Sequence, residues 1–134
     1  MQRSSATDPA ERFVAALAVR AFPRLAESLS PDVRMRALLP PGLVEISGAE
    51  AAVAKFSAWF GDAVEFELVH AGSEAFADRR HVFYRLRVRK PGNVTKVVEQ
   101  HLLCAFAHDR IREVDLICSG FRPEDATHDP SYQR

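Results

Sequence analysis

Several features that would point to a compartment or a partner are scarce or missing in this sequence. Only two cysteines occur, Cys104 and Cys118, so there is no disulfide framework of the kind that stabilises small secreted proteins. The 18 basic side chains are matched by 18 acidic ones, and a chain without net charge has no long-range field that attracts nucleic acid or an anionic membrane. No apolar run approaches the roughly 20 residues that span a bilayer. We therefore expect a cytoplasmic protein without nucleic-acid or membrane partners.

Patterns typical of metal sites are missing as well. The histidines, at positions 70, 81, 101, 108 and 128, do not have the spacings of metal ligands, and no pair of cysteines lies near them in the sequence. We expect no metal site and no cofactor. Cys104 and Cys118 have no predicted basic neighbour, which favours buried apolar side chains over nucleophiles. A predicted turn over 108–110 places Cys104 opposite residue 114 rather than 118, so we expect unpaired thiols.

The N-terminal part of the chain has the pattern of short helices. Asp8 precedes a proline and suits a helix cap, and Pro23 interrupts this helix and starts another. Farther along, Ser47 and Glu50 have the spacing of a second capping box, and the helix that follows is predicted to end at Gly61. The apolar face of that helix carries Val53, Phe56, Trp59 and Phe60.

The rest of the chain alternates as strands do. The predicted strands are 33–38, 63–71, 81–90, 94–107 and 111–119. Pro91-Gly92-Asn93 and His108-Asp109-Arg110 separate the last three as hairpin turns. Helices followed by neighbouring strands predict an α+β fold, in which one curved antiparallel sheet packs against N-terminal helices. We expect a single domain over 9–121, between a mobile N-terminus at 1–8 and a mobile C-terminal tail at 122–134.

A resemblance to a known family rests on three segments. They are the helix from Gly48 to Gly61, the stretch Val97-Val98-Glu99-Gln100-His101, and the ending Arg110-Ile111-Arg112-Glu113-Val114-Asp115. With these segments the chain resembles the nuclear transport factor 2-like superfamily, which includes ketosteroid isomerases and polyketide-cyclase-like proteins, over roughly residues 9 to 121. The resemblance implies a cone-shaped fold whose concave sheet face meets the helices and encloses a pocket.

Strand alternation sorts the side chains between the two faces of that sheet. The last strand presents Val114, Leu116 and Cys118 inward if a bulge follows Ile111. Phe66, Leu68 and His70 are expected to complete the inner wall, whereas Arg85, Arg87 and Arg89 face outward beside Glu65, Glu67 and Glu99. The predicted ligand-binding pocket is lined by Trp59, Tyr84, Leu86, Gln100, Leu102, Cys104, Leu116 and Cys118.

The resemblance also implies where catalytic groups would lie. Ketosteroid isomerases use an inward carboxylate base together with a tyrosine and an acid, and these positions fall on Ala37, near Phe13 and on Leu102. Proton abstraction needs an ionisable group, so three apolar residues argue against this chemistry. Cyclase-like relatives often use an inward His and Asp. His101 and Asp115 have these residue types, but alternation points both outward unless the register slips by one residue.

Three polar residues remain on the predicted inner face. His70 is the candidate for acid–base catalysis, and the alternative is a solvated histidine near a strand end. Tyr84 and Gln100 would each cost about 1–3 kcal/mol if they were buried without a partner. They therefore bond to each other or to water, or they bond to a ligand, and the sequence leaves both alternatives open.

These patterns favour a small-molecule-binding protein whose pocket takes an apolar or aromatic molecule. The first alternative is an acid–base enzyme of the cyclase, isomerase or dehydratase type, and the second is a non-catalytic scaffold or accessory domain. The sequence does not decide whether the protein is an enzyme. Phe83 and Leu103 lie among charges on the outer face, which predicts a homodimer formed through this face.

Overall fold

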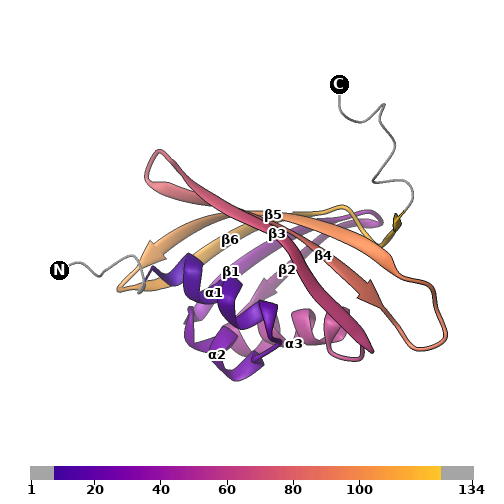
Figure 1. Ribbon diagram of the computed structural model, residues 1–134. Helices are drawn as coiled ribbons and strands as arrows, with labels where there is room; N and C mark the ends of the chain where they lie inside the picture. The colour runs from indigo at the N-terminus through magenta and orange to yellow at the C-terminus, as the bar shows by residue number, and fades with distance from the viewer. Residues whose placement is uncertain (1–7, 125–134) are drawn as a thin grey trace.

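The computed structural model describes residues 8–124, in which three helices lie on one side of a long curved sheet (Figure 1). The helices are α1 (Pro9–Ala18), α2 (Phe22–Glu27) and α3 (Ala49–Phe60). The strands are β1 (Leu29–Leu39), β2 (Gly42–Ser47), β3 (Glu65–Phe76), β4 (Arg79–Arg89), β5 (Lys96–Ala107), β6 (Arg110–Cys118) and the short β7 (Arg122–Pro123). The predicted mobile ends lie outside the described residues, apart from residue 8 and residues 122–124.

The sheet confirms the predicted α+β class. Its strand order is β2-β1-β6-β5-β4-β3, with β7 paired to β5, so the sheet is open and has edges at β2 and β3. All pairs are antiparallel except β1 with β6, which run parallel. The sequence did not predict this parallel pair, because it joins strands that are far apart along the chain. No helix among the described residues is long and apolar enough to cross a membrane.

The predicted start of the first helix is confirmed, and that of the third is wrong. Asp8 caps α1, because its Oδ1 accepts a hydrogen bond of 2.8 Å from the Ala10 amide. Ser47 instead ends β2, and Gly48 is the residue that precedes α3, without a side-chain cap. Gly48 has a φ of 95°, which is why glycine suits the change of direction from strand to helix.

Bulges in β6 and β3 set which of their side chains face inward. Phe106 pairs with Ile111 whereas Ala105 pairs with Glu113, so the predicted bulge after Ile111 is confirmed. The second bulge was not predicted: Leu68 pairs with Leu86 but His70 pairs with Arg85, which leaves one extra residue in β3. An extra residue reverses the alternation beyond it. His70 is consequently exposed on the outer face, and its predicted inward placement is wrong.

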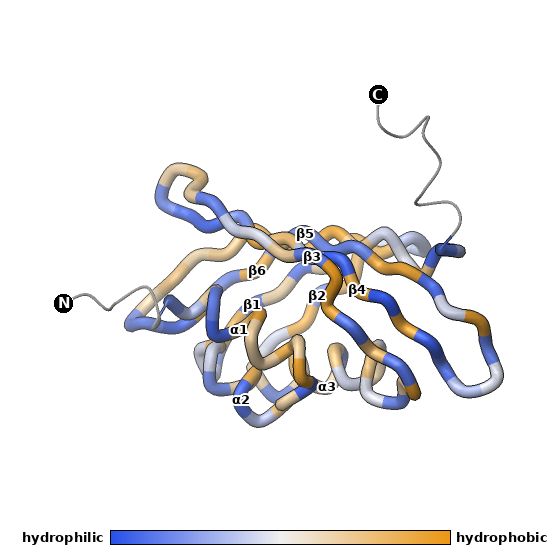
Figure 2. Tube along the Cα trace, viewed as in Figure 1, coloured by the Kyte–Doolittle hydropathy of each residue, from blue (hydrophilic) through white to orange (hydrophobic). Residues whose placement is uncertain are grey.

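The core lies between the helices and the concave face of the sheet. Hydrophobic and hydrophilic residues alternate along β3 and β4 (Figure 2), and the inward set of β4 is buried whereas that of β3 is at most half-buried. The largest fully buried side chains include Phe13, Phe56, Phe60, Leu86, Leu102 and Leu116. The predicted inward positions of β4 and β5, from Tyr84 to Cys104, are buried as expected. Side chains therefore fill most of the space that the cone encloses.

Three residues that we assigned to the C-terminal tail belong to the fold. Arg122 and Pro123 pair with β5, and Glu124 accepts a hydrogen bond of 2.7 Å from Arg87 Nε. Backbone pairing makes this segment a short strand of the sheet beside β5, and the ion pair with Arg87 holds it there. The sheet therefore extends to residue 123, two residues beyond the predicted domain boundary.

Candidate functional site

A cavity of about 270 Å³ opens at one end of the sheet, beside the turn that joins β1 to β2 and the C-terminal end of α3. We call it the end cavity. Its lining is apolar except for one amide and one thiol. The residues that line it are Leu39, Pro40, Pro41, Trp59, Phe60, Val98, Gln100, Cys118, Gly120 and Phe121. Among them, Gln100 and Cys118 lie opposite each other on β5 and β6.

A chain of hydrogen bonds runs from the core to this cavity. Tyr84 Oη donates to Gln100 Oε1 at 2.5 Å, and Gln100 Nε2 donates to Cys118 Sγ at 3.3 Å. The amide of Gly120 donates to the same sulfur at 3.4 Å. Tyr84 and Gln100 therefore bond to each other, which was one of the two alternatives from the sequence. Gln100 Nε2 carries a second hydrogen, and no acceptor for it is found among the described residues.

Burial fixes the protonation of two inward groups. Desolvation raises the pKa of Tyr84 well above its ordinary value, and nearby Cys118 and Cys104 add to the effect. Burial also raises the pKa of the Cys104 thiol to about 12, with smaller contributions from Asp8 and Asp115. At neutral pH the tyrosine is therefore a hydrogen-bond donor and Cys104 is a neutral thiol. Cys104 lies opposite Val114, as predicted, and both cysteines are free.

The structure brings together only part of the predicted pocket. Trp59, Gln100 and Cys118 line the end cavity. The other predicted residues, Tyr84, Leu86, Leu102, Cys104 and Leu116, are buried in the core next to it. Sequence reasoning missed the proline turn and Phe121 as lining residues. The dipeptide Pro40-Pro41 could have predicted this turn as part of the lining. It directly follows β1, whose alternate side chains face the core and which ends at the same end of the sheet.

The positions implied for catalytic groups lie in apolar surroundings. Ala37, Phe13 and Leu102 are each buried in the hydrophobic core. His101 is exposed on the outer face and Asp115 accepts a hydrogen bond from Arg36 there, in agreement with the alternation. The lining of the end cavity includes no histidine and no carboxylate among the described residues. The described lining therefore offers no carboxylate or imidazole for acid–base chemistry in this cavity.

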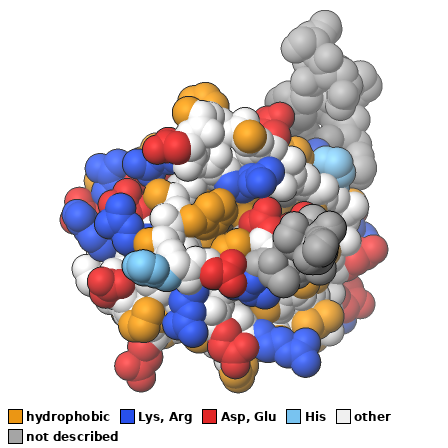
Figure 3. All heavy atoms as spheres, turned by 90° about the vertical axis from the view of Figure 1, so that its left-hand side faces the viewer, with side chains coloured by type: hydrophobic (Ala, Val, Ile, Leu, Met, Phe, Trp, Pro, Cys, Tyr) orange, Lys and Arg blue, Asp and Glu red, His pale blue; other side chains and the backbone are white. Residues whose placement is uncertain are grey.

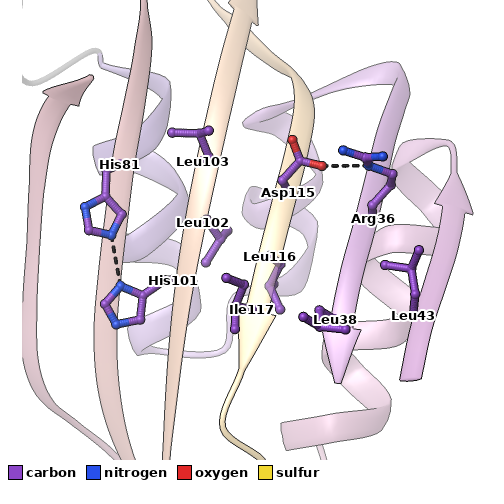
Figure 4. Close-up of a pocket in the computed structure, with 10 residues that line it drawn as sticks. All are labelled: Arg36, Leu38, Leu43, His81, His101, Leu102, Leu103, Asp115, Leu116 and Ile117. Carbon is purple, nitrogen blue, oxygen red and sulfur yellow. Dashed lines mark hydrogen bonds and ion pairs between the residues drawn. The ribbon is translucent and has the colours of Figure 1, made fainter. Parts of the chain in front are cut away.

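A larger hollow, of about 760 Å³, lies on the outer face of the sheet. We call it the outer hollow (Figure 4). Its lining residues are Arg36, Leu38, Leu43, His81, His101, Leu102, Leu103, Asp115, Leu116 and Ile117. Although its volume is larger, it is an open depression across strands. We give the end cavity more weight as a small-molecule site, because it lies between the sheet and α3 and contains buried polar atoms.

Cross-strand pairing arranges the outer hollow in two rows. One row joins Phe83, His101, Ile117, Leu38 and Leu43 from β4 to β2. The next row joins His81, Leu103, Asp115, Arg36 and Glu45. The first row is mainly apolar and the second carries the ion pair between Arg36 and Asp115, at 2.8 Å. Basic and acidic side chains also lie next to one another elsewhere on the surface (Figure 3).

Two histidines meet at one side of the outer hollow. His81 Nε2 lies 2.9 Å from His101 Nδ1, and His81 Nδ1 lies 3.2 Å from Glu74 Oε2. Sequence spacing missed this pair, because the residues come from adjacent strands and are 20 positions apart. The hairpin turn between the strands was the available signal, since it sets their register. No group of three or more potential metal ligands comes together within residues 8–124.

Comparisons with known proteins agree with this architecture. The SnoaL-like domain family matches residues 10–114 of the chain. No curated protein matches it. Among solved structures, Bal32a from a soil-derived mobile gene cassette is similar with a TM-score of 0.68 and 19% identity, covering 84% of this chain and 87% of that one.

Two further structures share the fold at low sequence identity. A protein from Xanthomonas campestris pv. campestris, named as a candidate polyketide cyclase, has a TM-score of 0.68 and 17% identity, and the match covers 86% of this chain and 90% of that one. A hypothetical protein from Catenulispora acidiphila, with a ketosteroid isomerase-like fold and in complex with trimethylamine, has a TM-score of 0.67 and 11% identity over 81% of this chain and 83% of that one. At these identities the likeness concerns the fold alone.

Proposed function

Because the chain belongs to the SnoaL-like domain family, we propose that it binds a small apolar or aromatic molecule in the end cavity and does not process that molecule quickly. The fold alone does not select a function, since one fold hosts many unrelated activities. The observation that carries the proposal is the lining of the end cavity. This lining is apolar almost throughout, and its one side-chain amide, that of Gln100, is buried.

The dimensions and polarity of the end cavity support a small, largely apolar ligand. A volume of about 270 Å³ falls just below the range of about 300–1,000 Å³ that is typical of ligand pockets, so the molecule is small. Trp59 and Phe60 offer aromatic surfaces for a flat ring. The second hydrogen of Gln100 Nε2 is a buried donor, and an acceptor on the ligand, such as a carbonyl oxygen, would satisfy it.

The same lining argues against rapid acid–base catalysis. A general base must lie within hydrogen-bond reach of the proton that it removes, and no described carboxylate or imidazole lines the end cavity. Names that relatives carry, such as polyketide cyclase, keep the enzyme alternative in view without supplying a catalytic group here. The scaffold alternative is favoured by one observation, namely that side chains fill most of the cone.

A matched pair of ligands tests the proposal. Acetophenone and α-methylstyrene have nearly the same shape, but only acetophenone has a carbonyl acceptor. We expect millimolar acetophenone to shift the NMR resonances of the Trp59 indole and the Gln100 side-chain amide, with a weaker effect from α-methylstyrene. Gln100→Leu should bind both ligands equally, and its free energy of unfolding should fall by about 1–3 kcal/mol, because the buried Tyr84 hydroxyl loses its acceptor. Leu43→Ala, on the outer face, is the control variant.

Two outcomes would count against the proposal. If neither ligand shifts the Trp59 or Gln100 resonances, while the protein is folded, the end cavity is not a site for small aromatic molecules. If a screen of cyclase and isomerase substrates instead finds rapid turnover, the enzyme alternative is correct. Trp59→Ala, which removes the bulky indole, should weaken the binding of both aromatic ligands, because this ring forms one wall of the end cavity.

A further inference from the structure

The histidine pair on the outer face is arranged by the sheet itself. His81 is paired with Leu103, and His101 is paired with Phe83, so the two histidines lie diagonally across adjacent antiparallel strands. Their ring planes are nearly parallel, with centroids 5.1 Å apart and an interplanar angle of 16°, and the two rings meet edge to edge through their nitrogens. The Phe83 ring lies 5.1 Å from the His81 ring and 5.8 Å from the His101 ring. These contacts hold His81 Nε2 and His101 Nδ1 at a separation of 2.9 Å, each directed at the other (Figure 4).

The Glu74 carboxylate determines which ring nitrogen of His81 carries hydrogen and which one has a lone pair to offer to a ligand. Its carboxylate lies 3.2 Å from His81 Nδ1, and an ionised carboxylate only accepts hydrogen bonds. The His81 proton therefore sits on Nδ1, and the lone pair of Nε2 points at His101 Nδ1. A carboxylate behind the imidazole is the arrangement that orients histidine ligands in metal sites, where it fixes the tautomer and raises the basicity of the ligand.

We propose that His81 Nε2 and His101 Nδ1 together bind a divalent transition-metal ion such as Zn²⁺. In the metal-free pair the protonated Nδ1 of His101 donates a hydrogen bond to His81 Nε2. On binding, this proton moves to His101 Nε2, and both facing lone pairs point at the ion. Imidazole nitrogens suit Zn²⁺, Cu²⁺ and Ni²⁺, whereas Mg²⁺ prefers oxygen ligands.

The observed distance is close to what such an ion requires. Zn–N bonds of about 2.0–2.1 Å at a tetrahedral angle place the two nitrogens about 3.3–3.4 Å apart, so the separation of 2.9 Å has to grow by roughly 0.4–0.5 Å. Turning each of the two partly solvated rings by roughly 35° separates the nitrogens and directs both lone pairs at an ion beside the line that joins them. The described residues offer no third side chain. Water would complete the coordination, so binding is reversible and weaker than in a structural zinc site.

Calorimetric titration of the tag-free protein with Zn²⁺ at neutral pH tests the proposal. We expect one saturable site per chain and no heat of binding with Mg²⁺. His81→Ala and His101→Ala should each weaken Zn²⁺ binding more than tenfold. Glu74→Gln should weaken it by about tenfold, because loss of an outer-shell partner costs about 10- to 100-fold in metal affinity. His108→Asn is the matched control: it removes an exposed histidine from a turn, and asparagine tolerates the positive φ there.

NMR of the unmodified protein gives a second measurement that does not depend on any variant. Added Zn²⁺ should shift the ring nitrogen resonances of His81 and His101 and move the His101 proton from Nδ1 to Nε2. The proposal is overturned if the titration shows no saturable site. It is also overturned if His101→Ala binds as tightly as the native chain, or if His108→Asn weakens binding as much as the pair variants do. In the last case the ion binds to surface histidines in general.

Discussion

The two faces of the same strands differ in how their polar groups are satisfied. Gln100 points inward, is fully buried and bonds to Tyr84 and Cys118. Its neighbours in the sequence point outward: Glu99 forms an ion pair of 2.7 Å with Arg85, and His101 contacts His81. On the inner face desolvation fixes the protonation of buried groups, whereas on the outer face water and salt screen the charges. The alternation therefore divides the strand between an apolar cavity and a polar, titratable surface.

The largest expected effect comes from testing this division with two leucines. Leu86 is 0% exposed in the core and Leu43 is 58% exposed on the outer face. Leu86→Ala should lower the free energy of unfolding by about 2–5 kcal/mol, because it leaves a cavity. Leu43→Ala should change it by less than about 0.5 kcal/mol. Urea denaturation measures both, and an equal loss at the two positions would contradict the division.

An intermediate effect concerns alkaline pH and the Cys104 thiol. Burial raises its pKa from 9.0 to about 12 in the folded state. Between these values the unfolded chain loses the thiol proton and the folded chain keeps it, so the unfolded state binds fewer protons and stability falls as pH rises. The slope from this group is about 1.4 kcal/mol per pH unit, and its stabilising effect is fully present below pH 9.

Cys104→Ala is the variant that isolates this effect. It should be less stable than the native chain at neutral pH, since it removes buried atoms, but its stability should fall less steeply above pH 9. Urea midpoints measured from pH 7 to 11 give both slopes. Burial also raises the pKa of Tyr84, so part of the alkaline loss should remain in the variant. Identical slopes for the two proteins would mean that the thiol is less desolvated than its position indicates.

The sequence predicted the strands and their faces where alternation is uninterrupted. The inward positions of β4 and β5 and the bulge after Ile111 are confirmed, and the alternation of polar and apolar residues is clearest in β4. The bulge in β3 was not predicted. Alternation continues on both sides of an extra residue, so the pattern near His70 fits either face. Gly72 marks the change: a Cβ atom there would lie 2.4 Å from the Phe83 ring on the outer face.

The candidate site was predictable in type but not in extent. Tyr84 and Gln100 were identified as polar residues on an apolar face, and the hydrogen bond between them follows from a register that the sequence alone does not give. The filling of the cone depends on how three helices pack, and periodicity within one element does not determine that volume. The histidine pair escaped prediction for the same reason, because it depends on contacts between strands.

The smallest expected effect concerns association through the outer face, which we propose forms a homodimer. Leu38 and Ile117 are 49% and 58% exposed, and they lie in one cross-strand row beside Leu103. Exposed apolar residues surrounded by ion pairs are typical of interface centres.

Leu103→Glu would place a charge next to Asp115, its partner on β6, and should weaken the dimer by about tenfold or more, equivalent to about 1.4 kcal/mol. Light scattering at micromolar concentrations measures the mass of both proteins. Val94→Glu, in the loop between β4 and β5, adds the same charge at a residue that is 71% exposed and should leave the dimer intact. A native chain that is monomeric under these conditions would refute the proposed interface. Both variants add one negative charge, but only Leu103→Glu places it in the proposed interface. Equal weakening of the dimer by the two variants would therefore mean that net charge, not the interface, causes the effect.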